Sequence, residues 1–107
     1  MAEVMVIVGL KPKAGKGEAL TGLVAKHLRV LREQDLVGDT PQLVGRAKDG
    51  TVVEVFRWKS QAAIDAAHEN PAVQALWGEF AEVCDYVPIG DVAEAGDLFS
   101  AFEPIEV

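Results

Sequence analysis

The chain has 107 residues, half of them hydrophobic, and a formal net charge of −7. This length suits one domain with a real core, and the acidic balance excludes a nucleic-acid backbone as a partner, since such binding depends on clustered Lys and Arg. No run approaches the roughly 20 apolar residues of a membrane helix, and Glu3 stands where a signal peptide would carry basic residues. We therefore expect a cytoplasmic protein without a membrane segment.

The first predicted element is a strand from Val4 to Leu10, an unbroken apolar run that ends at Lys11-Pro12. Such a run is typical of a strand that is buried on both faces. An amphipathic helix of about four turns follows the loop at 13–17. Its apolar positions recur at helical spacing and comprise Leu20, Leu23, Val24, His27, Leu28 and Leu31.

A β-hairpin is predicted next. The stretch Gly38-Asp39-Thr40-Pro41 breaks the chain after the helix. Residues Leu43 to Ala47 then pair with Thr51 to Trp58 across a turn at Asp49-Gly50.

Two helix segments and a short strand complete the predicted order. Ser60 can cap the first segment, which ends near Asn70-Pro71, where the proline can begin a second helix. Tyr86 to Ile89 forms a short strand, and Pro88 within it favours the edge or the end of a sheet. The apolar stripe of the second helix comprises Val73, Leu76, Trp77, Phe80 and Val83.

The order strand, helix, strand, strand, helix pair, strand predicts an α+β fold of the ferredoxin-like, split βαβ type, with an antiparallel sheet and helices on one face. The first and third strands carry large apolar residues at both parities, so the other face would expose an apolar surface, which marks an interface. We therefore predict a homodimer whose two sheets pack face to face. The single domain spans 1–107, with a core at about 4–89 and a C-terminal extension at 90–107 that would contact the partner subunit.

The third strand and the helix after it carry a resemblance to a known family. The strand ends in EVFRW (54–58), Lys59-Ser60 follows, and AAH (66–68) precedes Pro71. Over roughly Val4 to Ile89 the chain resembles the antibiotic biosynthesis monooxygenase family of dimeric α+β barrels. That family shares its fold with cofactor-free monooxygenases of aromatic polyketides or quinols, haem-degrading enzymes, decarboxylases, isomerases and proteins of no known activity. Fold analogy therefore does not settle the chemistry.

The resemblance implies a pocket between the sheet and the helices of each subunit. His68 is the predicted catalytic residue, because its pKa range suits proton transfer near neutral pH. It can equally be a structural cap near a helix C-terminus. The predicted substrate-binding residues are aromatic rings that can stack on a ligand and donors that can bond to it, namely Trp58, Trp77, Phe80, Tyr86 and Arg57.

Each of these residues also has a structural interpretation. Trp77 and Phe80 lie on the helix stripe and can simply belong to the core. Arg57 and Glu54 can be solvent-facing or dimer-interface charges. His27 is interpreted as a partly buried histidine at the rim of its helix.

We predict no metal and no cofactor. His27 and His68 are two donors without a third, and no HxxxH, CxxC or clustered carboxylate motif accompanies them. The haem-degrading branch of the resembled family needs an axial histidine where this chain has Trp77, and its characteristic tryptophan position holds Ala67. No flavin or nicotinamide fingerprint is present. Cys84 is alone and is interpreted as a small buried hydrophobic residue.

Two functions of different class follow from the sequence. The first is a cofactor-independent monooxygenase acting on a small aromatic or quinol-type substrate. The alternative is a non-catalytic homodimeric barrel that binds a small apolar ligand or serves a structural role. A cavity lined together by His68, Trp77 and Tyr86 would favour the enzyme. The identity of the substrate is not predicted.

Overall fold

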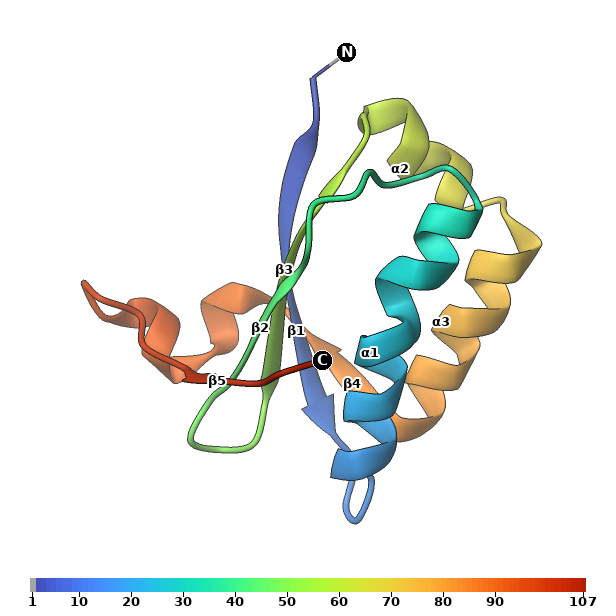
Figure 1. Cartoon of the computed structure of the whole chain (residues 1–107). Coiled ribbons are helices and arrows are strands. Elements are labelled where there is room, and N and C mark those ends of the chain that lie inside the picture. Colours follow the sequence, from blue (N-terminus) through green and yellow to red (C-terminus); the bar gives the residue numbers. More distant parts are fainter. Residues whose placement is uncertain (1) are drawn as a thin grey trace.

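The computed structural model describes residues 2–107. Within them, three α-helices pack on one face of a five-stranded antiparallel sheet of order β4-β1-β3-β2-β5, and the C-terminal segment lies on the opposite side (Figure 1). The strands are β1 (Val4–Pro12), β2 (Leu43–Arg46), β3 (Val52–Trp58), β4 (Cys84–Val87) and β5 (Glu103–Pro104), and the helices are α1 (Gly17–Glu33), α2 (Gln61–Ala67) and α3 (Pro71–Val83).

This arrangement confirms the predicted α+β class, the order of the elements and the antiparallel sheet. Ser60 accepts a hydrogen bond from the Ala63 amide at 3.1 Å and so caps α2 as predicted. Asn70 caps α3 through its side-chain oxygen, and Pro71 occupies the first turn of that helix. The edge strand β4 begins earlier than predicted, at Cys84, because β1 continues to Pro12 and Pro12 pairs with Cys84.

The hairpin between β2 and β3 closes as its turn residues predict. Gly50 has a φ of 94°, in the region that a residue with a Cβ avoids. The Asp49 carboxylate accepts a hydrogen bond from the Thr51 amide at 2.9 Å, and this bond lowers the pKa of Asp49.

Gly9 allows β4 to approach β1. Its Cα pairs with that of Val87, and a Cβ at position 9 would lie 2.2 Å from the Val87 carbonyl oxygen. Any side chain there would push the two strands apart. The glycine therefore fixes how closely the edge strand lies against the centre of the sheet.

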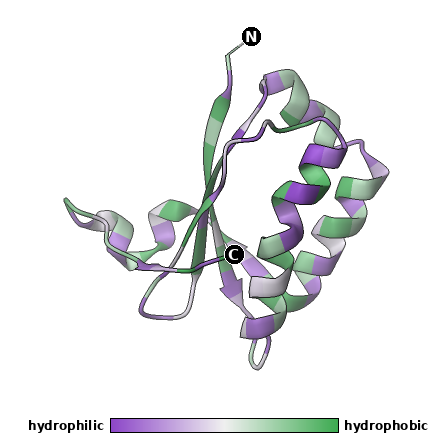
Figure 2. Cartoon of the chain, viewed as in Figure 1, coloured by the Kyte–Doolittle hydropathy of each residue, from purple (hydrophilic) through white to green (hydrophobic). Residues whose placement is uncertain are grey.

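The helix-covered face of the sheet holds the core. Figure 2 shows helices with alternating hydrophobic and hydrophilic bands beside strands that are hydrophobic along most of their length. The even-numbered residues of β1 and β3 turn toward the helices, as the twofold alternation of a strand requires. The buried clusters on this side include Leu10, Val52, Phe56 and Trp58 from the sheet, together with Leu20, Val24, Leu28, Leu31, Val73, Leu76 and Phe80 from the helices.

The opposite face is apolar and only partly covered. Met5 and Ile7 of β1 are 62% and 43% exposed, and Leu43 of β2 is 73% exposed. The C-terminal extension turns back onto this side, where Val53 and Val92 are buried.

The end of the extension pairs with its own chain. The short strand β5 pairs with β2, and Arg46 forms an ion pair with Glu103 at 2.9 Å. Contact of the extension with a partner subunit remains a prediction. Among residues 2–107, no helix has the length and apolar character needed to cross a membrane.

Candidate functional site

A small cavity of about 120 Å³ lies between the sheet and the helices, on the side where the resemblance implies a pocket. The sheet contributes a glutamate and a tyrosine to it, and α1 contributes a histidine. The seven lining residues are Val8 and Leu10 of β1, His27 of α1, Glu54 of β3, Trp77 and Phe80 of α3, and Tyr86 of β4.

The register of the sheet brings its four lining residues together. Val8 of β1 is paired with Glu54 of β3, and Leu10 of β1 is paired with Tyr86 of β4. Paired residues on neighbouring strands point to the same face, so these side chains form one patch under the helices. Trp77 and Phe80 are three positions apart on α3, which places them on one side of that helix.

His27 and Glu54 form a buried pair within this cavity lining. The His27 Nδ1 atom lies 2.9 Å and 3.0 Å from the two carboxylate oxygens of Glu54. Glu54 is 0% exposed and His27 is 6% exposed. When Glu54 is ionised its oxygens can only accept, so in that state the Nδ1–H group of His27 donates the hydrogen bond. The pairing explains how a glutamate is accommodated beneath a helical layer, because a buried carboxylate needs a hydrogen-bonded partner.

Two aromatic rings hold the imidazole in place. The centroids of Phe56 and Phe80 each lie 5.2 Å from that of His27, in edge-to-face geometry. With Nδ1 committed to Glu54, the ring presents its other nitrogen, Nε2, on the side away from the carboxylate.

The Nε2 atom of His27 is buried and has no hydrogen-bond partner among residues 2–107. A buried polar atom without a partner costs about 1–3 kcal/mol, so such atoms are rare and call for an explanation. In the neutral imidazole this nitrogen carries a lone pair and can accept a proton or a hydrogen bond. The pair can therefore act as a base on a ligand that enters the cavity.

Three of the residues predicted from the sequence line the cavity: Trp77, Phe80 and Tyr86. The Tyr86 hydroxyl donates to the Trp77 carbonyl oxygen at 3.1 Å, so it is engaged within the protein. Burial raises the pKa of Tyr86 above its usual value, which keeps this hydroxyl protonated as a donor.

The other three predicted residues lie elsewhere. His68 is exposed at the C-terminal end of α2, where its Nδ1 donates to the Ile64 carbonyl oxygen at 2.9 Å. Its ring lies edge-to-face against Trp77 at a centroid distance of 5.3 Å and does not line the cavity. Trp58 is buried in the neighbouring part of the core, 5.4 Å from the Phe56 ring.

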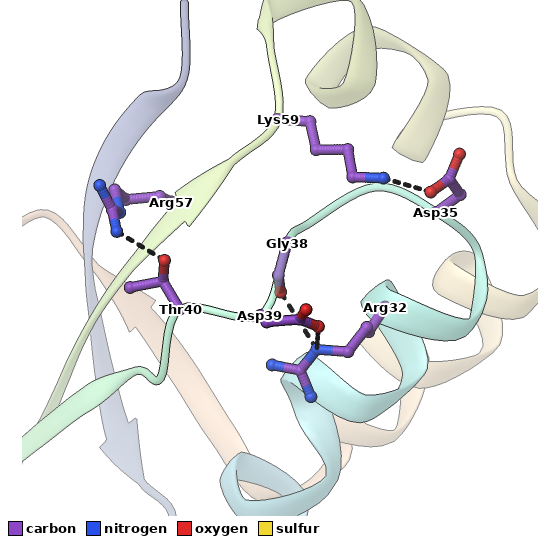
Figure 3. A network of polar contacts seen from close by, with 7 residues as sticks. All are labelled: Arg32, Asp35, Gly38, Asp39, Thr40, Arg57 and Lys59. Atoms are coloured by element: carbon purple, nitrogen blue, oxygen red, sulfur yellow. Dashed lines mark hydrogen bonds and ion pairs between the residues drawn. The ribbon is translucent and has the colours of Figure 1, made fainter.

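Arg57 belongs to a polar network around the loop after α1. It donates a hydrogen bond to Thr40 in that loop, and Lys59 pairs with Asp35 further along (Figure 3). Arg57 also forms an ion pair with Glu3 at 3.2 Å. As an odd-numbered residue of β3, Arg57 points to the sheet face opposite the cavity. These contacts anchor the loop to β3 and leave Arg57 outside the site.

Two interpretations from the sequence are wrong. His27 is not at the rim of its helix, and Glu54 is neither solvent-facing nor part of an exposed interface, because both are buried and bonded to each other. A signal for them was present in the sequence. His27 interrupts an apolar helical stripe, and Glu54 has the same parity as Val52, Phe56 and Trp58 on a strand rich in apolar residues.

A larger pocket, of about 660 Å³, lies on the opposite face, between the sheet and the C-terminal extension. Its lining includes Ile7, Leu43, Val53 and Phe102, and Ser100 supplies the only polar side chain among its lining residues. None of these side chains titrates near neutral pH, so the pocket offers room but no acid or base.

The donors for a metal site are few. Within the described part of the chain, no group of three or more His, Cys, Asp or Glu residues is arranged to hold a metal ion. Cys84 is buried, as predicted, and its thiol donates to the Phe80 carbonyl oxygen at 3.2 Å. Burial raises the pKa of this thiol to about 11, so it is a poor nucleophile at neutral pH.

Comparison with known protein families and with curated proteins finds no match for this chain. The residues of the site, and not a relative, must therefore support any assignment of function.

Proposed function

We propose that this protein is a small enzyme that removes a proton from a phenolic or quinol-type ring bound between its sheet and helices, as the first step of a cofactor-independent monooxygenation. One observation carries the proposal. A buried imidazole nitrogen, the Nε2 atom of His27, has no partner among residues 2–107 and belongs to a residue that lines an otherwise largely apolar cavity.

In this proposal His27 is the general base and Glu54 is the residue that orients it. Glu54 holds the tautomer in which Nε2 bears the lone pair, and the same carboxylate stabilises the imidazolium that forms when Nε2 accepts a proton. The ligand becomes an anion in an apolar environment, where it is a stronger electron donor than in water.

The reaction balances without an external reductant. A phenol that gains one oxygen atom from O₂ to become a quinone releases the second oxygen atom as water, and the ring supplies all the electrons. The role of the protein is to ionise the ring and to exclude water while O₂ reacts.

The volume of the cavity limits the substrate. A cavity of about 150 Å³ lined by apolar side chains is known to hold one benzene ring. The present cavity, at about 120 Å³, therefore suits a single substituted ring better than a polycyclic one.

Oxygen uptake with a panel of monocyclic phenols and quinols tests the proposal. The wild-type protein should consume oxygen saturably, and His27→Gln should lower kcat by about 10²-fold or more, as loss of a general base does. Glu54→Gln should keep much of the shape of the site but weaken the base. The parallel variant His68→Gln distinguishes this proposal from the role that the sequence predicts for His68. Uptake that depends on His68 and not on His27 would reject the proposal.

A non-catalytic ligand-binding protein remains the second candidate, because the cavity is largely apolar. Saturable quenching of tryptophan fluorescence by the same rings, without oxygen uptake, would favour it. Trp77 lines the cavity and would report the binding.

We further propose that the protein is a homodimer that pairs its uncovered sheet faces. The support is the exposed apolar surface formed by Met5, Ile7 and Leu43, which is unusual on a monomer. Leu43→Glu places a charge in this surface and should shift the molar mass measured by light scattering from dimer to monomer. An unchanged mass, or a monomeric wild type, would contradict the proposal.

A further inference from the structure

The walls of the His27 cavity differ in how much solvent they meet. Leu10, His27, Glu54 and Phe80 are buried, and Val8 and Trp77 are half-buried. Tyr86 is 53% exposed although it lines the same cavity. Tyr86 is therefore the lining residue that meets the most solvent, and its side chain lies between the cavity and bulk water.

This wall belongs to one edge of the sheet. Within residues 2–107, the strand β4 has four residues, lies at the edge of the sheet and has β1 as its single neighbour. The ring of Tyr86 is tied to α3 by one hydrogen bond, from its hydroxyl to the Trp77 carbonyl oxygen. The other walls, by contrast, are formed by the central strands β1 and β3 and by the helices α1 and α3. Local opening requires the least free energy where few contacts hold the element.

We propose that Tyr86 is the gate of the His27 cavity: it swings away to admit a ring, closes over it through its bond to Trp77, and determines the largest ligand that fits. For the identity of the ligand this inference rests on the proposed function. The gate itself follows from exposure, strand position and the single tether.

The gate explains a feature that a base in an apolar cavity requires. The ligand must reach Nε2 from solvent, yet water must be excluded once the ring is bound. A tyrosine meets both needs, because its ring covers an apolar ligand while its hydroxyl remains solvated when open and hydrogen-bonded when closed.

Chemical labelling tests access without any catalytic turnover. Diethyl pyrocarbonate acylates neutral imidazole nitrogens, and peptide mass spectrometry distinguishes the chain's two histidines, His27 and His68. In the wild type, the exposed His68 should react fast and His27 slowly. In Tyr86→Ala, we expect His27 labelling to accelerate by about tenfold, since labelling of a protected group follows the population of its open state. The rate at His68 should stay the same.

Two further variants control for a general loosening of the strand. Tyr86→Phe keeps the ring and removes the tether, so it should accelerate His27 labelling less than Tyr86→Ala does. Asp85→Ala alters the preceding residue, which is exposed and points to the other face, and it should leave the labelling rate unchanged. Equal rates at His27 in the wild type and in both Tyr86 variants would overturn the gate, as would an equal acceleration in Asp85→Ala.

Ligand size gives the second measurement. The ratio of the naphthol Kd to the phenol Kd, measured by tryptophan fluorescence, should fall about tenfold in Tyr86→Ala relative to the wild type if Tyr86 limits the space. An unchanged ratio would overturn its role in selecting size. If both tests support the gate but the protein takes up no oxygen, the proposed reaction is rejected and the gate is not. If oxygen uptake depends on His27 but the labelling pattern is unchanged in the Tyr86 variants, the gate is rejected and the reaction is not.

Discussion

The two faces of the sheet present opposite combinations of space and chemistry. The helix-covered face has a cavity of about 120 Å³ with a buried His27–Glu54 pair, and the other face has a pocket of about 660 Å³ with no acid or base in its lining. Volume alone would select the second. The unpartnered imidazole nitrogen favours the first, because burying such an atom costs free energy and its presence therefore suggests a function.

The comparison also separates two kinds of apolar surface. On the helix side, apolar residues pack into one another and surround the polar pair. On the other side, Met5, Ile7 and Leu43 meet solvent, and the C-terminal extension covers only part of the face. The first surface stabilises the monomer, and the second can stabilise an assembly. Variants on each side can test this division.

The largest expected difference in stability is between Phe80→Ala and Leu43→Ala. Phe80 is 2% exposed, and truncating a buried phenylalanine costs about 3–5 kcal/mol. Leu43 is 73% exposed, so its truncation should change the stability of the monomer by no more than about 0.5 kcal/mol. Urea unfolding at low protein concentration measures both, and equal losses would show that the two faces do not differ in this way.

The second prediction concerns the His27–Glu54 pair. Glu54→Leu alone leaves the Nδ1–H of His27 buried without an acceptor, which should cost about 1–3 kcal/mol. The double variant His27→Phe/Glu54→Leu replaces both groups by apolar ones and should be about as stable as the wild type, or more stable. Both variants should lose activity. If the costs of Glu54→Leu and of His27→Phe simply add in the double variant, the two residues are not energetically coupled, which would contradict the prediction.

A pH effect of smaller size is expected at Cys84. Burial and, secondarily, the charge of Asp85 raise the pKa of the thiol from 9.0 to about 11. Between these values the folded state keeps a proton that the unfolded state loses, so stability must fall as the pH rises through this window and is fully present below about pH 9. The fall should be shallower in Cys84→Val. Free energies of unfolding measured at about pH 8 and about pH 10 for both proteins check the sign.

The smallest effect should come from Arg57, on the face opposite the cavity. Its ion pair with Glu3 is exposed, so Arg57→Ala should cost about 0.2–1 kcal/mol, and less in high salt. Oxygen uptake should not change. A large loss of activity in this variant would mean that the opposite face contributes to the reaction and would weaken the contrast between the two faces.

Local signals in the sequence were sufficient for the elements. The apolar run of β1, the stripe of α1, the Asp49-Gly50 turn, the Ser60 cap and Pro71 each act within a few residues, so their outcome does not depend on the rest of the chain. The order of these elements then predicted an antiparallel sheet with helices on one face. The start of the edge strand was misplaced, because it depends on pairing with β1.

The lining of the candidate cavity was predicted in part. Trp77, Phe80 and Tyr86 line the cavity as expected of aromatic residues on the helix stripe and the edge strand. His68 was favoured over His27 because it lies in the stretch that carries the family resemblance, whereas His27 was interpreted as a partly buried histidine at the rim of its helix. Nothing local indicates that a histidine at position 27 and a glutamate at position 54 meet.

The sequence by itself determined the secondary structure, the α+β class and the apolar character of both faces of the sheet, since these follow from residue periodicity and turn chemistry. Only the tertiary structure decided which polar groups share a cavity. The register of β1 against β3 places Glu54 on the helix-covered face, and the packing of α1 on that face brings His27 within hydrogen-bonding distance of it. Contacts between residues so distant in the chain depend on how whole elements dock, and no spacing within the sequence encodes them directly.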